Sequence, residues 1–321
     1  MSWQLVGAAQ FALGESPFWH PHEQCLYGVD IAGGLIWRMQ AASGATETWA
    51  TPQALGEPAC IAPALGGGLV VAMRSGVYRA REWRGELTCL APAPYDATTQ
   101  RFNDGKADPQ GRFWSSTYCE DRLPRAHLYS LDARGLAVPV MTAAAVNLPN
   151  DVPGVTGGNG LAWSPDGATL YWADTAAHAV RAWDWDGHFN TLGNGHMFHQ
   201  FDPKPPGWAY GAPGFQAYQG RPDGAAVDVQ GNYWVAMYEG GCVKKLSPAG
   251  QVLATVATPA LCPTMPCFGG DDLQTLYLTT ARKGRSAQEL AVLPLSGHVF
   301  AMRVEVPGLP VNFFCDCLQS Q

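Results

Sequence analysis

The chain has 321 residues and a formal net charge of −7, and 47% of its residues are hydrophobic while 15% are charged. No block of Lys or Arg is present, which argues against nucleic acid or an anionic membrane surface as a partner. No run of about 18 apolar residues occurs, so we expect no membrane-spanning helix. No secretory signal pattern is visible and the nine Cys are irregularly spaced. We therefore expect reduced thiols and a cytoplasmic location.

In chain order, four segments follow one plan, in which a polar residue precedes a short strand, a turn and an aromatic-rich strand, and two fainter copies, from Cys60 and Cys267, fit between and after them. They begin near residues 15, 60, 103, 159, 223 and 267. The steps between them are roughly 45, 43, 56, 64 and 44 residues, and a four-stranded propeller blade takes about 40–50 residues. Scattered through these segments are 37 Gly and 25 Pro, which suits short strands joined by turns and leaves little room for helix.

These repeats predict an all-β fold, a six-bladed β-propeller that forms a single domain over residues 1–321. The first strand, near Trp3–Ala9, is expected to complete the last blade beside Val299–Val304 and so to close the ring. The two long steps predict insertions near 143–157 and 188–220. The second insertion is rich in Gly, Pro and aromatic residues, so we expect it to pack against the propeller.

Four polar residues stand at the head of a repeat: Glu15, Asn103, Asn159 and Asp223. The innermost strand of each blade lines the central channel, so these side chains should meet near the axis. Two carboxylates and two amides form an oxygen-rich set that suits Ca²⁺, Mg²⁺ or Mn²⁺, and carboxylate also serves Zn²⁺. The alternative is turn chemistry, because Asp-Gly and Asn-Gly are ordinary turn pairs.

At these positions the sequence resembles the gluconolactonase/regucalcin (senescence marker protein) family of six-bladed propellers. The similar stretches run in family order through nearly the whole chain: "LGESPFWHP", "RFNDGKADPQGRFW", "NGLAWSPDGATLYWADT", "RPDGAAVDVQGNYWVA" and "PCFGGDDLQTLYLTTAR". The resemblance implies a hydrolase that depends on one divalent cation and opens a sugar lactone to the aldonic acid. It does not say which lactone, which ion or which oligomeric state.

The resemblance also implies roles for individual residues. Glu15, Asn159 and Asp223 take the positions of the family's metal ligands. Arg101 and Asn103 take those of its substrate-binding pair. A further acidic substrate contact falls on Glu120 or Asp121. The family commonly has glycine where this chain has Ser16.

Lactone hydrolysis needs a polarised carbonyl, an activated water and a stabilised oxyanion. We expect a divalent cation to act as the Lewis acid and Asp223 to act as the general base, with pure ligation as the competing role for that carboxylate. Arg101 offers a fork of donors to a lactone carbonyl or to sugar hydroxyls. Two other functions stay open: a metal-dependent esterase or phosphotriesterase, and a non-enzymatic calcium-binding or scaffold propeller.

Overall fold

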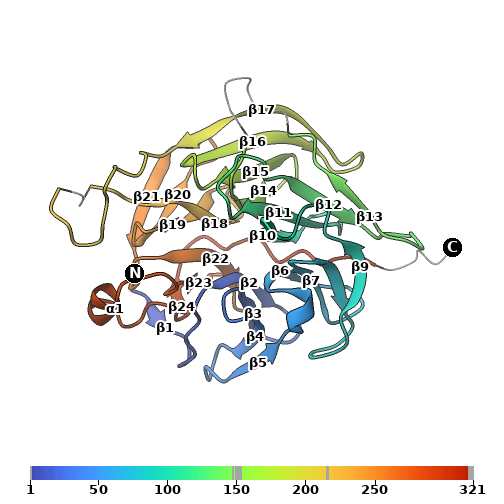
Figure 1. The fold of residues 1–321 in the computed structure, drawn as a ribbon, viewed down its shortest axis with the longest axis horizontal. Helices are drawn as coiled ribbons and strands as arrows, with labels where there is room; N and C mark the ends of the chain where they lie inside the picture. The colour runs from blue at the N-terminus through green and yellow to red at the C-terminus, as the bar shows by residue number, and fades with distance from the viewer. Residues whose placement is uncertain (1, 147, 149–153, 215–216, 317–321) are drawn as a thin grey trace.

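The computed structural model describes residues 2–146, 148, 154–214 and 217–316, and within them the chain is a six-bladed β-propeller (Figure 1). Each blade is a four-stranded antiparallel sheet whose strands follow one another from the channel to the rim. Two short helical segments are described, the 3₁₀ turn Gln53–Leu55 and the helix α1 (Ala287–Val292). No helix in the described ranges is both long and apolar enough to span a bilayer.

The strands of the six blades have the following bounds. Blade 1 holds β2 (Gly14–His20), β3 (Cys25–Asp30), β4 (Leu35–Gln40) and β5 (Thr46–Ala50); blade 2 holds β6 (Pro58–Pro63), β7 (Leu69–Met73), β8 (Gly76–Ala80) and β9 (Thr88–Pro92). Blade 3 holds β10 (Gln100–Ala107), β11 (Phe113–Cys119), β12 (Leu128–Asp132) and β13 (Val140–Ala143); blade 4 holds β14 (Gly158–Trp163), β15 (Thr169–Asp174), β16 (Ala179–Asp186) and β17 (Thr191–Gln200). Blade 5 holds β18 (Arg221–Val227), β19 (Tyr233–Tyr238), β20 (Cys242–Leu246) and β21 (Val252–Ala257); blade 6 holds β22 (Pro263–Gly269), β23 (Thr275–Thr280), β24 (Phe300–Arg303) and β1 (Gln4–Leu5).

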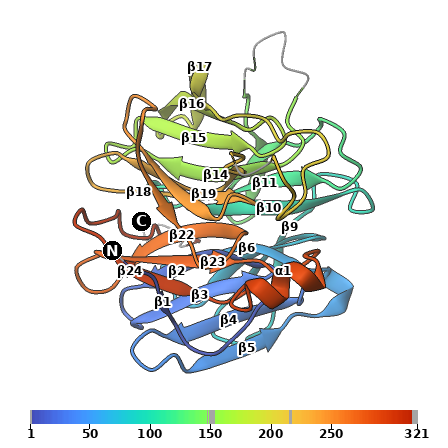
Figure 2. The ribbon, with the colours of Figure 1, turned by 90° about the vertical axis from the view of Figure 1, so that its left-hand side faces the viewer.

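The two ends of the chain meet in the ring. Strand β1 pairs with β24, so the N-terminus supplies the outer strand of the last blade as the sequence predicts. After β24 the C-terminal segment crosses the middle of the ring (Figure 1), where Gly308 pairs with Asp228 of blade 5 and Phe314 pairs with Ala64 of blade 2. Viewed from the side, this segment and α1 lie at opposite ends of the propeller (Figure 2).

Apolar side chains fill the spaces between blades. Buried residues of the described ranges form six clusters, and each cluster is shared by two neighbouring blades. Between blades 3 and 4, for example, the indole of Trp163 lies 5.8 Å from that of Trp114 and 5.6 Å from that of Trp185. Such aromatic pairs stabilise a packed core beyond the effect of buried area. The aromatic side chains of the repeated strands therefore pack neighbouring blades against each other.

The predicted insertion at 188–220 is partly wrong, because β17 (Thr191–Gln200) lies inside it and is the outer strand of blade 4. The added segment therefore runs from about residue 201 to residue 220, with 215–216 outside the described residues. Of the predicted insertion at 143–157, residues 147 and 149–153 also lie outside them. At its far end, Gly157 and Val155 bridge to Tyr118 and Ala126 of blade 3.

Each inner strand is interrupted near the same place. In all six blades the pairing of the first two strands shifts register close to the start of the inner strand: after Glu15, Pro58, Phe102, Asn159, Pro222 and Pro263. A bulge of this kind bends the strand and turns a side chain away from the regular pleat. The repeat thus aims the residues at or beside the bulge at the channel axis.

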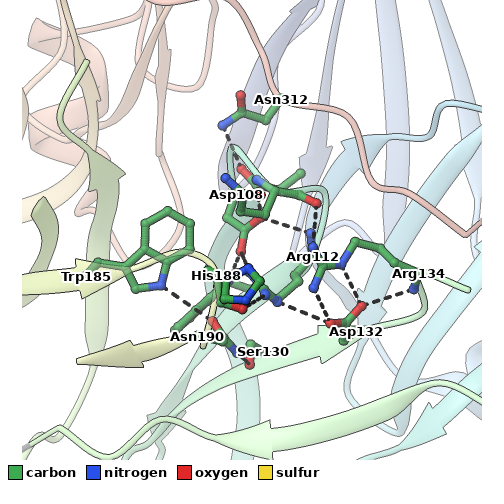
Figure 3. Close-up of polar contacts among 12 residues, drawn as sticks. Asp108, Arg112, Ser130, Asp132, Arg134, Trp185, His188, Asn190 and Asn312 are labelled. Carbon is green, nitrogen blue, oxygen red and sulfur yellow. Dashed lines mark hydrogen bonds and ion pairs between the residues drawn. The ribbon is translucent and has the colours of Figure 1, made fainter. Parts of the chain in front are cut away.

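The opposite end of the inner strand carries a second repeated feature, which fixes the turn into the next strand. The sequences "DPQGRFW" and "DVQGNYW" place Asp108 and Asp228 one residue after β10 and β18, where both are fully buried. Asp108 accepts hydrogen bonds from the Arg112 backbone N–H at 3.0 Å and the Trp114 indole at 2.8 Å. Figure 3 shows how Arg112 extends this contact to Asp132. These carboxylates organise the turn.

Candidate functional site

Four side chains from four blades converge at the bulged end of the channel. Glu15, Asn103, Asn159 and Asp223 come from β2, β10, β14 and β18, and each is only 6–9% exposed. Next to the first of them, Ser16 has a φ of 49°, a left-handed conformation that a glycine adopts more readily. The Ser16 hydroxyl accepts a hydrogen bond from the Ile61 N–H at 3.0 Å, which ties this bulge to blade 2.

Hydrogen bonds join the predicted substrate residues of blade 3 to the predicted metal ligand of blade 4. Arg101 Nη1 donates to Asn103 Oδ1 at 2.7 Å. The Asn103 amide then donates from Nδ2 to Asn159 Oδ1 at 2.8 Å and to the Gly158 carbonyl at 2.9 Å. The ring of Tyr118 lies 4.9 Å from the Arg101 guanidinium and supports it from one side. These contacts place Arg101, Asn103 and Asn159 together.

Thr175 fixes the orientation of the Asn159 amide. The Thr175 hydroxyl donates to the Pro222 carbonyl at 2.8 Å, so its proton is already committed. It can therefore only accept from Asn159 Nδ2, which lies 2.6 Å away. This arrangement turns Asn159 Oδ1 away from Thr175 and toward Asn103, from which it accepts a hydrogen bond. Thr175 was not predicted from the sequence, and the only signal for it is its place directly after the aromatic-rich strand of blade 4.

Three buried carboxylates influence one another at this end of the channel. Burial, then the charges of Asp223 and Asp104, raise the pKa of Glu15 well above its usual range. Burial and the charge of Asp104 raise the pKa of Asp223 to about 8, against the opposing effect of Arg221 and Arg101. Burial also raises the pKa of Asp104. The protein alone thus disfavours the ionised state of all three groups.

Asp104 is followed by Gly105, a pair that is typical of a turn. Its carboxylate nevertheless lies near Glu15 and Asp223 and raises the pKa of both. Its Oδ2 accepts a hydrogen bond from the Leu161 N–H at 2.9 Å, whereas its Oδ1 is buried with no partner in the described part of the chain. Its position directly after Asn103, inside the bulge, is the sequence feature that distinguishes it from a surface turn residue.

The donor set fits a hard divalent cation. Glu15 and Asp223 provide carboxylate oxygens and Asn159 provides an oriented amide oxygen, which are the ligand types that Ca²⁺, Mg²⁺ and Mn²⁺ prefer. A cation would also relieve the repulsion among the buried carboxylates. Within the described ranges, no three His, Cys, Asp or Glu side chains gather closely enough to hold an ion on their own. The candidate donor set therefore combines two carboxylates with the Asn159 amide.

The two candidate acidic substrate contacts lie in different surroundings. The Glu120 carboxylate accepts a hydrogen bond from Arg74 Nη2 at 2.8 Å, and the same guanidinium nitrogen donates to Glu57 at 2.6 Å. Asp121 forms an ion pair with Arg125 on the exposed surface. Of these two residues, Glu120 is the one connected to Arg101. The connection runs through Arg74 to Glu57, whose Oε1 lies 3.9 Å from Arg101 Nε.

Beneath the converging residues, the channel contains a cavity of about 270 Å³. Most of its lining is apolar, with Ser16, Lys106, Ser164 and Asn312 as polar members, and the C-terminal segment also contributes Pro310 and Val311 to its wall. The ammonium group of Lys106 donates to the Ala225 carbonyl at 2.9 Å and so links blades 3 and 5 across the channel. The polar site therefore lies above a largely apolar channel.

Comparison with known proteins gives consistent matches over nearly the whole chain. Residues 13–282 match the family model described as "SMP-30/Gluconolactonase/LRE-like region". The chain is 41% identical over 306 residues to 6-deoxy-6-sulfogluconolactonase of Pseudomonas putida, covering 94% of each protein, and 30% identical over 316 residues to regucalcin of Gallus gallus, covering 96% of each.

Solved structures show the same fold. A calcium-binding protein, regucalcin, of Agrobacterium tumefaciens superposes with a TM-score of 0.84 at 22% identity, covering 98% of this chain and 97% of that one. A gluconolactonase of Xanthomonas campestris superposes with a TM-score of 0.64 at 18% identity, covering 96% and 89%. At these identities the superpositions establish the propeller architecture.

Proposed function

The chain belongs to the SMP-30/gluconolactonase/LRE-like family, and from that premise we propose that it is a divalent-metal-dependent hydrolase of sugar lactones. One observation carries the proposal. The oxygen-rich set of Glu15, Asn159 and Asp223 is hydrogen-bonded, through Asn103, to a guanidinium that can bind a carbonyl or hydroxyl oxygen. This arrangement supports a proposal in which the residues for the cation and those for the sugar are neighbours.

A divalent cation bound by these three residues would supply Lewis-acid polarisation of the lactone carbonyl. Asp223 takes the proton of the attacking water. In the metal-free protein, burial and the charge of Asp104 raise the pKa of this carboxyl, so it can serve as a base only when its ionised form is stabilised. A bound cation would lower that pKa and keep the carboxylate ionised.

Arg101 and Asn103 bind and orient the substrate. The guanidinium of Arg101 is held by Asn103 and by the ring of Tyr118, so little side-chain freedom remains to be lost when a ligand binds. A lactone has a carbonyl and several hydroxyls, and the Arg101 guanidinium offers N–H donors to them, while the Asn103 donors are held by Asn159 and Gly158. Glu120, hydrogen-bonded to Arg74 beside this pair, stays our candidate for accepting a hydrogen bond from a sugar hydroxyl.

The test is hydrolysis of a panel of aldonolactones by protein stripped with a chelator, with each divalent ion restored singly. Proton release at near-neutral pH is compared with the spontaneous rate. We expect no acceleration without metal and at least 100-fold acceleration of one lactone with one preferred ion. Equal rates in the chelated and the restored protein would overturn the metal dependence.

A second function is favoured by one finding, because the relatives include regucalcin and a solved regucalcin described as calcium-binding. In that reading the same three residues hold Ca²⁺ and no ester is cleaved. Calorimetry on the chelated protein separates the two functions. Tight Ca²⁺ binding without acceleration of any lactone would favour the binding protein.

A further inference from the structure

The site contains a second arginine that repeats the place of the first. Arg101 pairs with Tyr118 across β10 and β11, and Arg221 pairs with Tyr238 across β18 and β19. Each arginine stands two residues before a converging polar residue, Asn103 or Asp223. Each guanidinium also lies over its paired tyrosine, at 4.9 Å for Arg101 and 5.2 Å for Arg221. The propeller repeat therefore presents both guanidinium groups at the same end of the channel.

The two arginines differ in how their donors are used. Arg101 Nη1 donates to Asn103 Oδ1 and to the Phe102 carbonyl. For Arg221, the ion pair with Glu239 is long, at 3.4 Å from Nη2 to Oε2, and Nε is buried without a partner among the described residues. A guanidinium carries five N–H donors. Arg221 therefore has donors available to a ligand.

Arg221 lies among charges of both signs. The carboxylate of Glu239 is shared by Lys204 at 2.7 Å and by Arg285 at 2.9 Å, so two other cations already compensate it. Arg285 also pairs with Glu289 at 2.6 Å. Asp223 interacts with the charge of Arg221 as well, but the proposed function assigns that carboxylate to the divalent cation. With Asp223 held by the cation, Arg221 is left without a carboxylate of its own. Lys204 and Arg221 approach the same oxygen, Glu239 Oε2, and so lie close to each other.

We infer that Arg221, assisted by Lys204, binds an anionic tetrahedral substituent, a sulfonate or a phosphate, on the sugar lactone. Bidentate, charge-assisted hydrogen bonds from a guanidinium suit such a group. The inference rests on the proposed function and narrows its substrate class to lactones that carry a negative charge away from the reacting carbonyl. The relative named 6-deoxy-6-sulfogluconolactonase is consistent with this class.

The experiment compares three lactones that differ in the substituent at one end: gluconolactone, 6-phosphogluconolactone and 6-deoxy-6-sulfogluconolactone. For the metal-loaded wild-type protein we expect kcat/KM to be at least 30-fold higher for one of the two anionic lactones than for gluconolactone. The variant R221M should lower that ratio by about 30-fold, the size of effect that one charged hydrogen-bonding partner produces. K204Q should lower it by about 5-fold.

Two controls keep the result interpretable. R303M removes an exposed arginine that pairs with Asp272 at the other end of the propeller, and it should leave the ratio unchanged. Calorimetric binding of the sulfonated and the unsubstituted aldonic acids reports the subsite without turnover, and circular dichroism checks that each variant is folded. R221K, which keeps the charge but not the fork, should recover part of the preference.

The two proposals fail in different ways. If the wild-type protein hydrolyses all three lactones at similar rates, or if R221M keeps the preference, the anion subsite is wrong and the lactonase proposal stands. If it hydrolyses none of them and binds neither acid, both proposals are overturned. A preference for sulfonate over phosphate, or the reverse, identifies which anion the site accepts.

Discussion

Buried carboxylates stand at both ends of the inner strands, and their surroundings are opposite. At one end, Asp228 accepts hydrogen bonds from the backbone N–H of Gln230 and Asn232 and from the indole of Trp234, and Lys245 lies 3.4 Å away. At the other end, Asp223 lies close to the charge of Asp104 and its pKa is raised to about 8. Several N–H donors surround Asp228 where it holds a turn, whereas at Asp223 the Gly224 N–H and the charges of Arg221 and Arg101 do not offset burial and the charge of Asp104.

This difference teaches how to separate structural from functional carboxylates in a repeated fold. A carboxylate that organises a turn is surrounded by the N–H groups that it orders, so its charge is compensated within the protein. The charge of a carboxylate that binds a cation or accepts a proton is only partly compensated by the protein. The folded state tolerates the unfavourable free energy of burying that charge.

The largest effect is expected for Asp223→Asn. Hydrolysis should fall by about 1,000-fold because the proton acceptor is lost. The free energy of unfolding of the chelated variant should nevertheless be about 2 kcal/mol higher than that of the chelated wild type at pH 7. The raised pKa of Asp223 makes the wild type take up a proton on folding, and asparagine does not need one. Steady-state kinetics and urea unfolding measure the two effects. A variant that kept wild-type turnover would falsify the role of Asp223.

At the opposite end, Asp228→Ala is expected to lower the free energy of unfolding by about 3 kcal/mol, because several buried donors lose their acceptor. The kcat/KM of the folded fraction should stay within twofold of wild type. Urea unfolding and lactone hydrolysis at low temperature measure the pair of effects. If activity falls while stability is unchanged, the contrast between the two ends is wrong.

Thr175→Val should lower kcat/KM by about 10-fold and weaken binding of the divalent ion. The valine cannot accept the hydrogen bond of the Asn159 amide, so the orientation of the amide is no longer fixed. Thr175→Ser, which keeps the hydroxyl, is the matched control and should recover both properties. Equal ion affinity in the two variants, measured by calorimetry, would contradict the positioning role.

The smallest effect concerns Asp132, which lies in the network of Figure 3. Hydrogen bonding to Arg134 lowers the pKa of Asp132 to about 2. A lowered pKa in the folded state stabilises the protein above the unfolded pKa of about 3.9, and the gain is lost as the pH falls toward 2. We expect Asp132→Asn to be less stable by about 1 kcal/mol at pH 6, a value reduced for solvent screening. Unfolding curves at pH 6 and pH 3 should show that difference shrinking.

Much of the fold could be read from the chain, because blades 1, 3, 4 and 5 repeat an aromatic-rich strand after a turn and blades 2 and 6 follow the same spacing more faintly. Strand β17 was missed since "TLGNGHMFHQ" is rich in Gly, Asn and His and has no regular alternation. It is a strand because it pairs along the edge of β16, and that tertiary contact outweighs local propensity.

The site was harder to read from sequence. The convergence of Glu15, Asn159 and Asp223 follows from repeat position, so it could be predicted. The orientation by Thr175 could not, because it depends on a hydrogen bond to the carbonyl of Pro222 in another blade. The arginine before Pro222 was also overlooked, since nothing in the local sequence shows that Arg221 repeats the place of Arg101 over a tyrosine.

The pairing of β1 with β24 sets the order in which the molecule can be completed. The sixth blade gains its outer strand only when residues 4–5 pair with residues 300–301. The ring therefore stays open until nearly all of the chain has left the ribosome. Contacts between such distant residues slow folding, because a long loop must close before they form. Removing the first five residues should therefore act mainly on the late closure step and leave the earlier blades able to form.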